Sequence, residues 1–273
     1  AAALIVGGVS VDELMQRARR GAAEWVWRMS GGRSVTVLCG PGNNGGDGYV
    51  IAEAIRERGG AVQVIAASES RTPASRTARG LYQGAVLGRD ADPDGEVLVD
   101  CLFGTGLTRP LEPADLALLS RLAASHPRRI AVDLPSGVHA DNGMTLNDNL
   151  PDWHLTLALG AWKPAHFLLP AGATMGEMRR VPIGVETLPE AALLIVRPYL
   201  AAPAVDAHKY RRGLLGVVAG AMPGAALLAA RAAQGAGAGY VKLLGAADGA
   251  TADLVTDREP LAEVLTDSRY RAL

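Results

Sequence analysis

The chain begins with short apolar runs that alternate with longer segments whose apolar residues recur at helical spacing. The runs predict strands over residues 34–39, 61–66, 97–101, 130–134, 154–159 and 178–181. The segments between them predict helices over residues 10–23, from 49 onward, 74–87 and 113–124. Strands that alternate with helices of roughly 10–15 residues are typical of βαβ units. The predicted fold class is therefore α/β, with a doubly wound parallel sheet.

A second α/β segment is predicted after a stretch of Ala and Pro at residues 198–205, which has the composition of a linker. It comprises a strand at 214–219, a glycine turn, a helix at 224–235 and a strand at 239–244. Residues 213–230 carry no charge and approach the length of a membrane span. Their glycines and Pro223 favour strand, turn and helix over a span.

Composition narrows the class of protein. A chain of 273 residues is long enough for two domains. Its content of 49% apolar and 20% charged residues is typical of soluble globular proteins. A net charge of −1 gives no field that would favour nucleic acid or an anionic membrane. Two cysteines, Cys39 and Cys101, are too few for a disulfide scaffold and favour a reducing, cytoplasmic setting.

Three polar segments directly follow predicted strands: GPGNNGGDG at 40–48, DCLFGTGLTRP at 100–110 and DLPSGVHADNG at 133–143. Ligands of open α/β sheets bind outside the carboxyl ends of the strands. Each segment places an Asp and glycines at that edge. Together they predict a binding site where the three loops converge.

The first segment contains Gly40-x-Gly42-x-x-Gly45, which fits a dinucleotide-binding fingerprint. A hydride-transfer domain also needs an acidic residue at the end of the second strand, and Glu69 comes late for that role. The alternative is a turn that needs glycines only for backbone geometry. The side-chain oxygens of Asn43, Asn44 and Asp47 favour a functional loop instead.

Asp133 ends a buried strand, where a partly desolvated carboxylate is a candidate general acid or base; a turn-forming Asp is the alternative. Asp100 also ends a strand, and the alternative to a functional role is again an Asp that caps the next turn. Oxygens from Asn44, Asp100 and Ser136 could together hold a hard cation, and so few carboxylates suit potassium better than zinc.

Two further residue types leave alternatives open. Lys163 either faces a substrate or lies in a solvated loop. Cys39 and Cys101 both end strands and are predicted to be small buried fillers rather than reactive groups.

The three loops together resemble the NAD(P)H-hydrate epimerase domain, through GPGNNGGDGYVIA, VDCLFGTGL and VDLPSGVHADNG. The likeness runs from about Val9 to Val185. The stretch from His208 resembles the opening of an ADP- or ATP-dependent NAD(P)H-hydrate dehydratase domain. The resemblance implies a Rossmann-like sheet in residues 1–197, a linker at 198–207 and an incomplete ribokinase-like α/β segment at 208–273.

The resemblance also implies roles for residues. Asn44, Asp100 and Ser136 match the potassium ligands, and Asp133 matches the acid at the reacting nicotinamide carbon. The segment matching the substrate-phosphate loop comprises Asn43, Asn44, Gly45, Gly46 and Asp47. The segment matching the substrate-lining loop comprises Gly104, Thr105, Gly106, Leu107, Thr108, Arg109 and Pro110.

The implied activity is interconversion of the R and S forms of hydrated NAD(P)H, written NAD(P)HX, at carbon 6 of the nicotinamide ring, by a homo-oligomer. A complete fusion would also dehydrate S-NAD(P)HX with ADP or ATP and Mg²⁺. The GxGD-type motif of that activity is not found between Leu244 and Leu273.

The alternatives are an NAD(P)-dependent oxidoreductase and a non-catalytic nucleotide-binding scaffold. Gln16 and Arg19 depart from the family's LMExAG pattern, which puts one contact with substrate or a second subunit in doubt.

Overall fold

A computed structural model of the chain describes residues 11–93, 95–183, 192–195, 197–199, 201–209, 211–245 and 249–272, with side chains from residue 20 to residue 270 of these ranges. The side chains of Gln16 and Arg19 therefore lie outside the described part. Contacts divide the chain between Ala192 and Leu193 into two compact units. Each unit is described separately.

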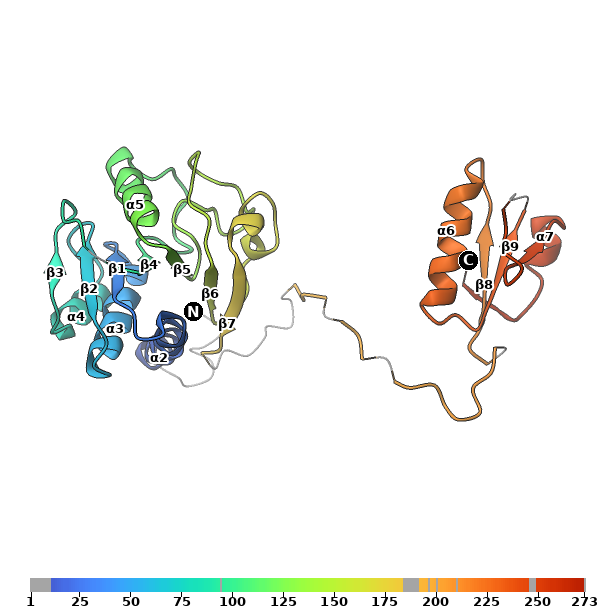
Figure 1. Cartoon of the computed structure of the whole chain (residues 1–273), viewed down its shortest axis with the longest axis horizontal. Helices are drawn as coiled ribbons and strands as arrows, with labels where there is room; N and C mark the ends of the chain where they lie inside the picture. The colour runs from blue at the N-terminus through green and yellow to red at the C-terminus, as the bar shows by residue number, and fades with distance from the viewer. Residues whose placement is uncertain are drawn as a thin grey trace. The chain divides into compact units, whose positions relative to one another are not determined.

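The first unit contains one sheet of seven parallel strands, in the order β3-β2-β1-β4-β5-β6-β7 (Figure 1). The order reverses between β1 and β4, so the predicted doubly wound, Rossmann-like sheet is confirmed. The strands are β1 (Val35–Cys39), β2 (Val62–Ala66), β3 (Val86–Leu87), β4 (Val97–Cys101), β5 (Arg128–Val132), β6 (Leu155–Leu159) and β7 (Glu177–Val181).

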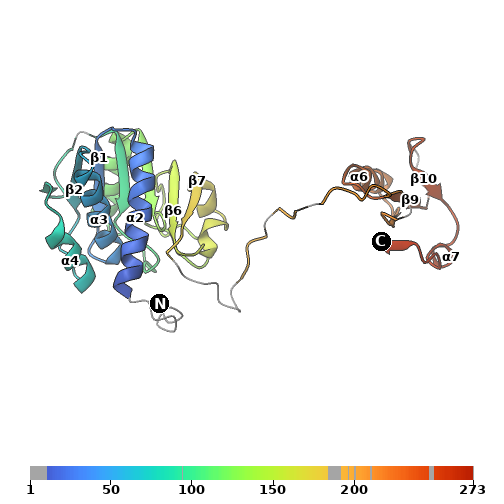
Figure 2. The ribbon, with the colours of Figure 1, turned by 90° about the horizontal axis from the view of Figure 1, so that it is seen from below.

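Helices cover both faces of this sheet. In Figure 2 the helices α2 (Val11–Ser30), α3 (Asn43–Glu57) and α4 (Pro73–Leu81) lie together over one face. Helix α5 (Pro113–Ser125) lies on the other face in Figure 1. Two short 3-10 helices, Pro164–His166 and Ala171–Thr174, follow β6.

The central strands β1 and β4 are buried on both faces, because their side chains alternate between two cores, whereas the edge strand β7 is partly exposed. Val37 and Val99 point into the core beneath α2, α3 and α4. Leu38 and Leu98 point into the core beneath α5. This explains why the sequence shows continuous apolar runs rather than an alternating pattern.

Three predicted boundaries were wrong. The helix predicted over residues 10–23 continues to Ser30. Helix α3 begins at Asn43 and not after Gly48, so two thirds of the predicted glycine loop, residues 43–48, are helical. The helix predicted at 74–87 ends at Leu81, and Val86–Leu87 form the edge strand β3, paired with β2. Gly84 lowers helix propensity there.

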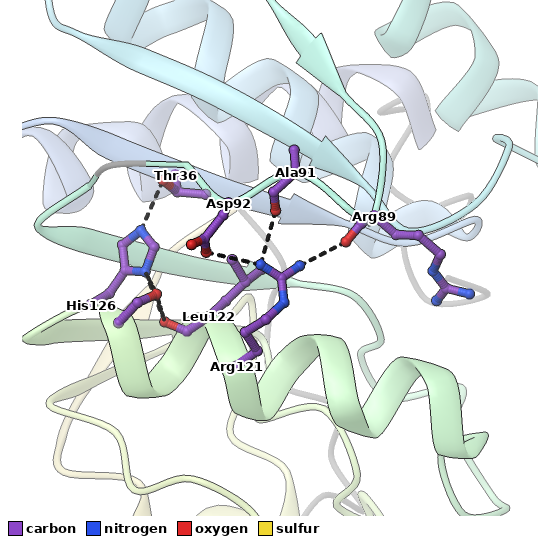
Figure 3. Close-up of polar contacts among 8 residues, drawn as sticks. Thr36, Arg89, Ala91, Asp92, Arg121, Leu122 and His126 are labelled. Atoms are coloured by element: carbon purple, nitrogen blue, oxygen red, sulfur yellow. Dashed lines mark hydrogen bonds and ion pairs between the residues drawn. The ribbon is translucent and has the colours of Figure 1, made fainter.

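Helix α5 is fastened to the sheet by two polar side chains (Figure 3). The Arg121 guanidinium donates to the backbone carbonyls of Arg89 (2.7 Å) and Ala91 (2.9 Å), and so holds the β3–β4 connection. His126, fully buried, contacts the Leu122 carbonyl through Nδ1 (2.8 Å) and the Thr36 hydroxyl through Nε2 (2.9 Å). Burial lowers the pKa of His126 below its usual value.

The second unit has its own four-stranded parallel sheet, in the order β10-β9-β8-β11. The predicted strand, turn and helix at 214–235 are confirmed. Three short elements, β10, α7 and β11, were not predicted, and the ribokinase-like assignment stays a prediction. The elements are β8 (Leu214–Val218), α6 (Pro223–Gly235), β9 (Tyr240–Leu244), β10 (Val255–Asp257), α7 (Leu261–Val264) and β11 (Tyr270–Ala272).

The uncharged stretch at 213–230 is divided between β8 and α6. Among the described helices, none combines the length and apolar character that crossing a membrane requires.

We expect acid to destabilise the fold through His126. The pKa of His126 is lower in the folded protein than in the unfolded chain. As pH falls through about 6.5, the unfolded chain therefore binds more protons than the folded protein. The free energy of unfolding then falls by at most about 1.4 kcal/mol per pH unit. His126→Gln should therefore lose less stability between about pH 7.5 and 5.5 than the unchanged protein, measured by urea unfolding. His139→Gln is the control. An equal pH dependence in both variants would contradict the assignment.

Candidate active site

Four neighbouring strands bring the predicted site residues to one edge of the sheet. Strands β1, β4, β5 and β6 are adjacent and parallel, so their carboxyl ends lie side by side. Three residues separate the end of β1 from the start of α3. Asp100 is the penultimate residue of β4, Asp133 follows β5 directly, and Lys163 lies in the loop after β6.

The start of α3 can receive an anion. Its N-cap residue is Gly42, so no side chain caps the first turn. Unpaired N–H groups and the helix dipole favour negative charge at such a terminus. Asn43 is exposed there, whereas Asp47 is buried one turn further along.

The glycines of this turn have a packing function. A Cβ atom on Gly45 would lie 1.9 Å from the Gly40 carbonyl oxygen. One on Gly48 would lie 2.7 Å from Cys39 Sγ and 2.8 Å from Cys101 Cβ. These glycines let the start of α3 pack directly against the ends of β1 and β4. Their structural role, given in the sequence analysis as the alternative to ligand binding, therefore has a physical basis.

Asp100 and Ser136 form a closed hydrogen-bonded pair. The Ser136 hydroxyl donates to Asp100 Oδ1 (2.8 Å), and its backbone N–H donates to Oδ2 (2.9 Å). The Leu102 N–H also donates to Oδ1 (3.0 Å). Complete burial raises the pKa of Asp100 to about 6, although these donors oppose the shift. The pair ties the end of β4 to the loop after β5.

The side chain of Asn44, at the carboxyl edge of the sheet, has unsatisfied hydrogen-bonding groups. Its carboxamide oxygen and nitrogen are both buried, and neither has a hydrogen-bond partner within the described residues. A Cβ on Gly104 would lie 3.3 Å from both Asn44 Cγ and Asp133 Oδ2. Asn44 and Asp133 therefore face one small space that glycine leaves open. Buried polar groups without partners are rare and indicate an absent ligand or ion.

Asp133 sits in a left-handed backbone conformation, with φ 70°. Few residues tolerate this region, and Asp and Asn are among them. The turn aims the carboxylate back over β6, where Oδ1 accepts from the Leu159 N–H (3.3 Å) and from Lys163 Nζ. Lys163 also donates to the Leu159 carbonyl (2.9 Å). The side chains of Asp133 and Lys163 are only 13% and 18% exposed, so water screens this ion pair weakly.

His166 connects the loop that carries Lys163 to the left-handed turn at Asp133. Its Nε2 contacts the Asp133 carbonyl oxygen (3.0 Å), and its Nδ1 accepts from the Lys163 N–H (2.9 Å). Nδ1 also lies 3.1 Å from the Lys163 carbonyl oxygen, so both ring nitrogens contact backbone carbonyls of the two loops. Burial lowers the pKa of His166, which favours the neutral ring. Trp162 packs edge-on against the His166 ring at 5.3 Å.

The loop after β4 divides into anchors and exposed positions. Leu107 is buried in the core beneath α5, so its side chain fastens the loop. Asn147 pairs with both backbone groups of Leu111, at 2.7 and 3.2 Å. The exposed positions of the predicted lining segment are Thr105, Gly106, Thr108, Arg109 and Pro110.

Both thiols lie beneath the site rather than in it. Cys39 and Cys101 are fully buried, and burial raises their pKa values well above the ordinary range. The prediction that they are buried fillers is confirmed.

Sequence reasoning missed the role of Lys163 and did not consider His166. The usable signal was topological: Asp133 and Lys163 follow two strands that could be adjacent in a parallel sheet. For Lys163 the solvated alternative is wrong, because its ammonium group is partly buried and paired.

Residues 11–165 match the family described as "YjeF-related protein N-terminus". A "Bifunctional NAD(P)H-hydrate repair enzyme Nnr" of Mycobacterium leprae is 33% identical over 86% of this chain and 51% of that protein. An "NAD(P)H-hydrate epimerase" of Rhodopirellula baltica is 34% identical over 63% of this chain and 75% of that protein.

The chain thus spans about half the length of the bifunctional relatives that it matches. A crystal structure of yeast ynu0 aligns with a TM-score of 0.54 and 22% identity, over 63% of this chain and 79% of that one. This likeness supports the fold alone.

We expect Gly48→Ala to destabilise the protein, although Ala is the better helix former. The added methyl meets Cys39 and Cys101, and overpacking costs about 1–3 kcal/mol. Gly80→Ala in α4 meets no atom within 4 Å and should gain up to about 1 kcal/mol from helix propensity. Urea unfolding of both variants measures the difference. Equal stability of the two would refute the packing function.

Proposed function

The chain belongs to the family of YjeF-related protein N-termini, and we propose that its first unit epimerises hydrated NAD(P)H at carbon 6 of the nicotinamide ring. The buried Asp133–Lys163 ion pair at the sheet edge carries this proposal. It places one transferable proton beside a space bounded by Asn44 and Gly104. The names of the relatives support the same substrate class.

In the proposed reaction, the 6-hydroxyl group leaves as water and the nitrogen lone pair of the ring forms a double bond to carbon 6. The leaving oxygen takes its proton from the ion pair, through Asp133. Water then adds to the opposite face of carbon 6 and returns a proton to the pair. The epimer forms with no net gain or loss of atoms.

Lys163 has a positioning role in this scheme. Its ammonium group donates to Oδ1 of Asp133 and so fixes the orientation of the carboxylate. His166 holds the backbone of both residues. The first turn of α3 is proposed to bind the substrate phosphates through Asn43 to Asp47.

We further propose a potassium ion held by Asn44, Asp100 and Ser136. The unsatisfied Asn44 oxygen, the buried Asp100 carboxylate and the Ser136 hydroxyl are hard oxygen ligands that suit such an ion. Within the described residues, no group of three His, Cys, Asp or Glu side chains could hold a metal ion. When bound, the ion would supply positive charge at the ends of β1 and β4.

The wider setting is also a proposal. The protein is expected to act in the cytoplasm as a homo-oligomer. Dehydration of S-NAD(P)HX with ADP or ATP and Mg²⁺ is proposed only for a protein with a complete dehydratase domain.

Asp133→Asn tests the proton-transfer step. Asn tolerates the left-handed backbone, so the fold should persist, whereas epimerisation should fall by about 10²–10⁴-fold. Chiral chromatography of R and S hydrate measures interconversion. Wild-type rates in this variant would sink the assignment, and hydride transfer from NAD(P)H to an acceptor would favour an oxidoreductase instead.

Lys163→Met tests the positioning role. Without the ammonium group, Oδ1 of Asp133 loses the donor that orients it, so kcat of epimerisation should fall by a larger factor than KM changes. Lys209→Met, in the second unit, is the control. An unchanged kcat in Lys163→Met would remove Lys163 from the mechanism.

The potassium proposal predicts ion-specific stabilisation. KCl should raise the melting temperature more than LiCl, and a concentration one hundred times the Kd stabilises by about 2.7 kcal/mol. Asn44→Ala should abolish the difference between the salts, while Asn43→Ala, which alters an exposed neighbour, should retain it. If Asn44→Ala keeps the full difference, these residues do not hold the ion.

A further inference from the structure

A second recess lies on the opposite side of β1 from the Asp133 site. It is a cleft of about 610 Å³, between the end of β2 and helix α4. Ala66, the last residue of β2, and Tyr49 of α3 form part of its wall. Its volume falls in the range of small-molecule sites, about 300–1,000 Å³.

Two arginines without carboxylate partners line this cleft. Within the described residues, neither Arg76 nor Arg79 forms an ion pair. The Arg79 guanidinium lies over the Tyr49 ring, 5.5 Å from its centre, which restricts its orientation. Arg76 donates through one nitrogen to the Arg71 carbonyl (2.5 Å), which leaves its other donors available. Such paired guanidinium groups favour a phosphoryl ligand.

The loop after β2 contributes polar groups to the same cleft. Ser70 Oγ is buried in this cleft, beside the Tyr49 side chain. Ser68 and Glu69 are exposed beside it. Glu69 is the acidic residue that comes late for a ribose-binding position in a hydride-transfer domain. In the structure it still lines a recess at the end of the second strand.

This loop adjoins the turn that leads into α3. The Arg71 N–H donates to the Pro41 carbonyl (2.8 Å), and the Ala67 N–H donates to the Cys39 carbonyl (3.0 Å). Along the sheet, the order from the cleft is therefore β2, then β1 with the start of α3, then β4, then β5 and β6 with the ion pair. A dinucleotide whose reacting ring lies at β5 and whose phosphates lie at α3 reaches β2 with its adenosine half.

We propose that this cleft holds the adenosine half of the substrate, and that Arg76 and Arg79 bind a phosphoryl group on its ribose. NADPHX is then bound more tightly than NADHX. The proposal rests on the proposed function, because it names the form of that substrate. Glu69 opposes the phosphoryl group, and its exposed position lets it turn toward solvent.

Titration calorimetry with two fragments tests the cleft without catalysis. The full chain should bind adenosine 2′,5′-bisphosphate at least about tenfold more tightly than 5′-AMP, about 1.4 kcal/mol. Arg79→Gln and Arg76→Gln should each remove most of this discrimination. Arg71→Gln alters an exposed arginine of the same loop whose side chain does not line the cleft, and it should retain the discrimination.

Kinetics separate this inference from the proposed function. Arg79→Gln should raise the KM for NADPHX about tenfold, with kcat and the KM for NADHX nearly unchanged. Epimerisation with equal fragment affinities in the unchanged protein would overturn the cleft assignment and leave the function standing. Fragment discrimination without epimerisation would overturn the proposed function and leave the phosphoryl site standing. Discrimination that survives both arginine substitutions would also overturn the cleft assignment.

Discussion

The arrangement of the site depends on one close contact, between the first turns of α3 and the ends of β1 and β4. Gly40, Gly45 and Gly48 leave no room there for a side chain. Because the backbone elements touch, the helix terminus opens at the point where the strand order reverses. Ligands of doubly wound sheets bind at such a reversal. The neighbouring loops can then converge on the positive end of α3.

A second constraint acts at Asp133. Its left-handed conformation turns the carboxylate from the end of β5 toward β6, where Lys163 meets it. Strained backbone persists where the surroundings over-determine it. Here the surroundings are His166 and the Leu157 carbonyl, which accepts from the Asp133 N–H (2.8 Å). The conformation admits Asp among few residues, and the proposed chemistry needs its carboxylate.

The sequence was sufficient for the central strands of the sheet, because strands buried on both faces give nearly continuous apolar runs such as 97–99. It was insufficient for β3, β10 and β11, which are two or three residues long and owe their extended form to a neighbouring strand. The start of α3 was missed because glycines predict a loop by propensity, while here they satisfy packing.

The candidate site shows the same division between local and tertiary information. Asp100, Ser136 and Asp133 could be picked out because each follows a strand in a glycine-containing loop. The pairing of Asp133 with Lys163 depends on β5 and β6 being neighbours and on the φ angle of Asp133. Neither the adjacency of these strands nor this φ angle can be predicted from the spacing of residues in the sequence.

The edge-on packing of Trp162 gives the protein a built-in optical probe. The indole adjoins Lys163 in the chain, and its ring packs against both His166 and Phe167 at 5.3 Å. A ligand that displaced Lys163 from Asp133 would act next to this indole. In a variant whose other three tryptophans, Trp25, Trp27 and Trp153, are replaced by Phe, the emission of Trp162 would therefore report on occupancy of the site without an attached dye.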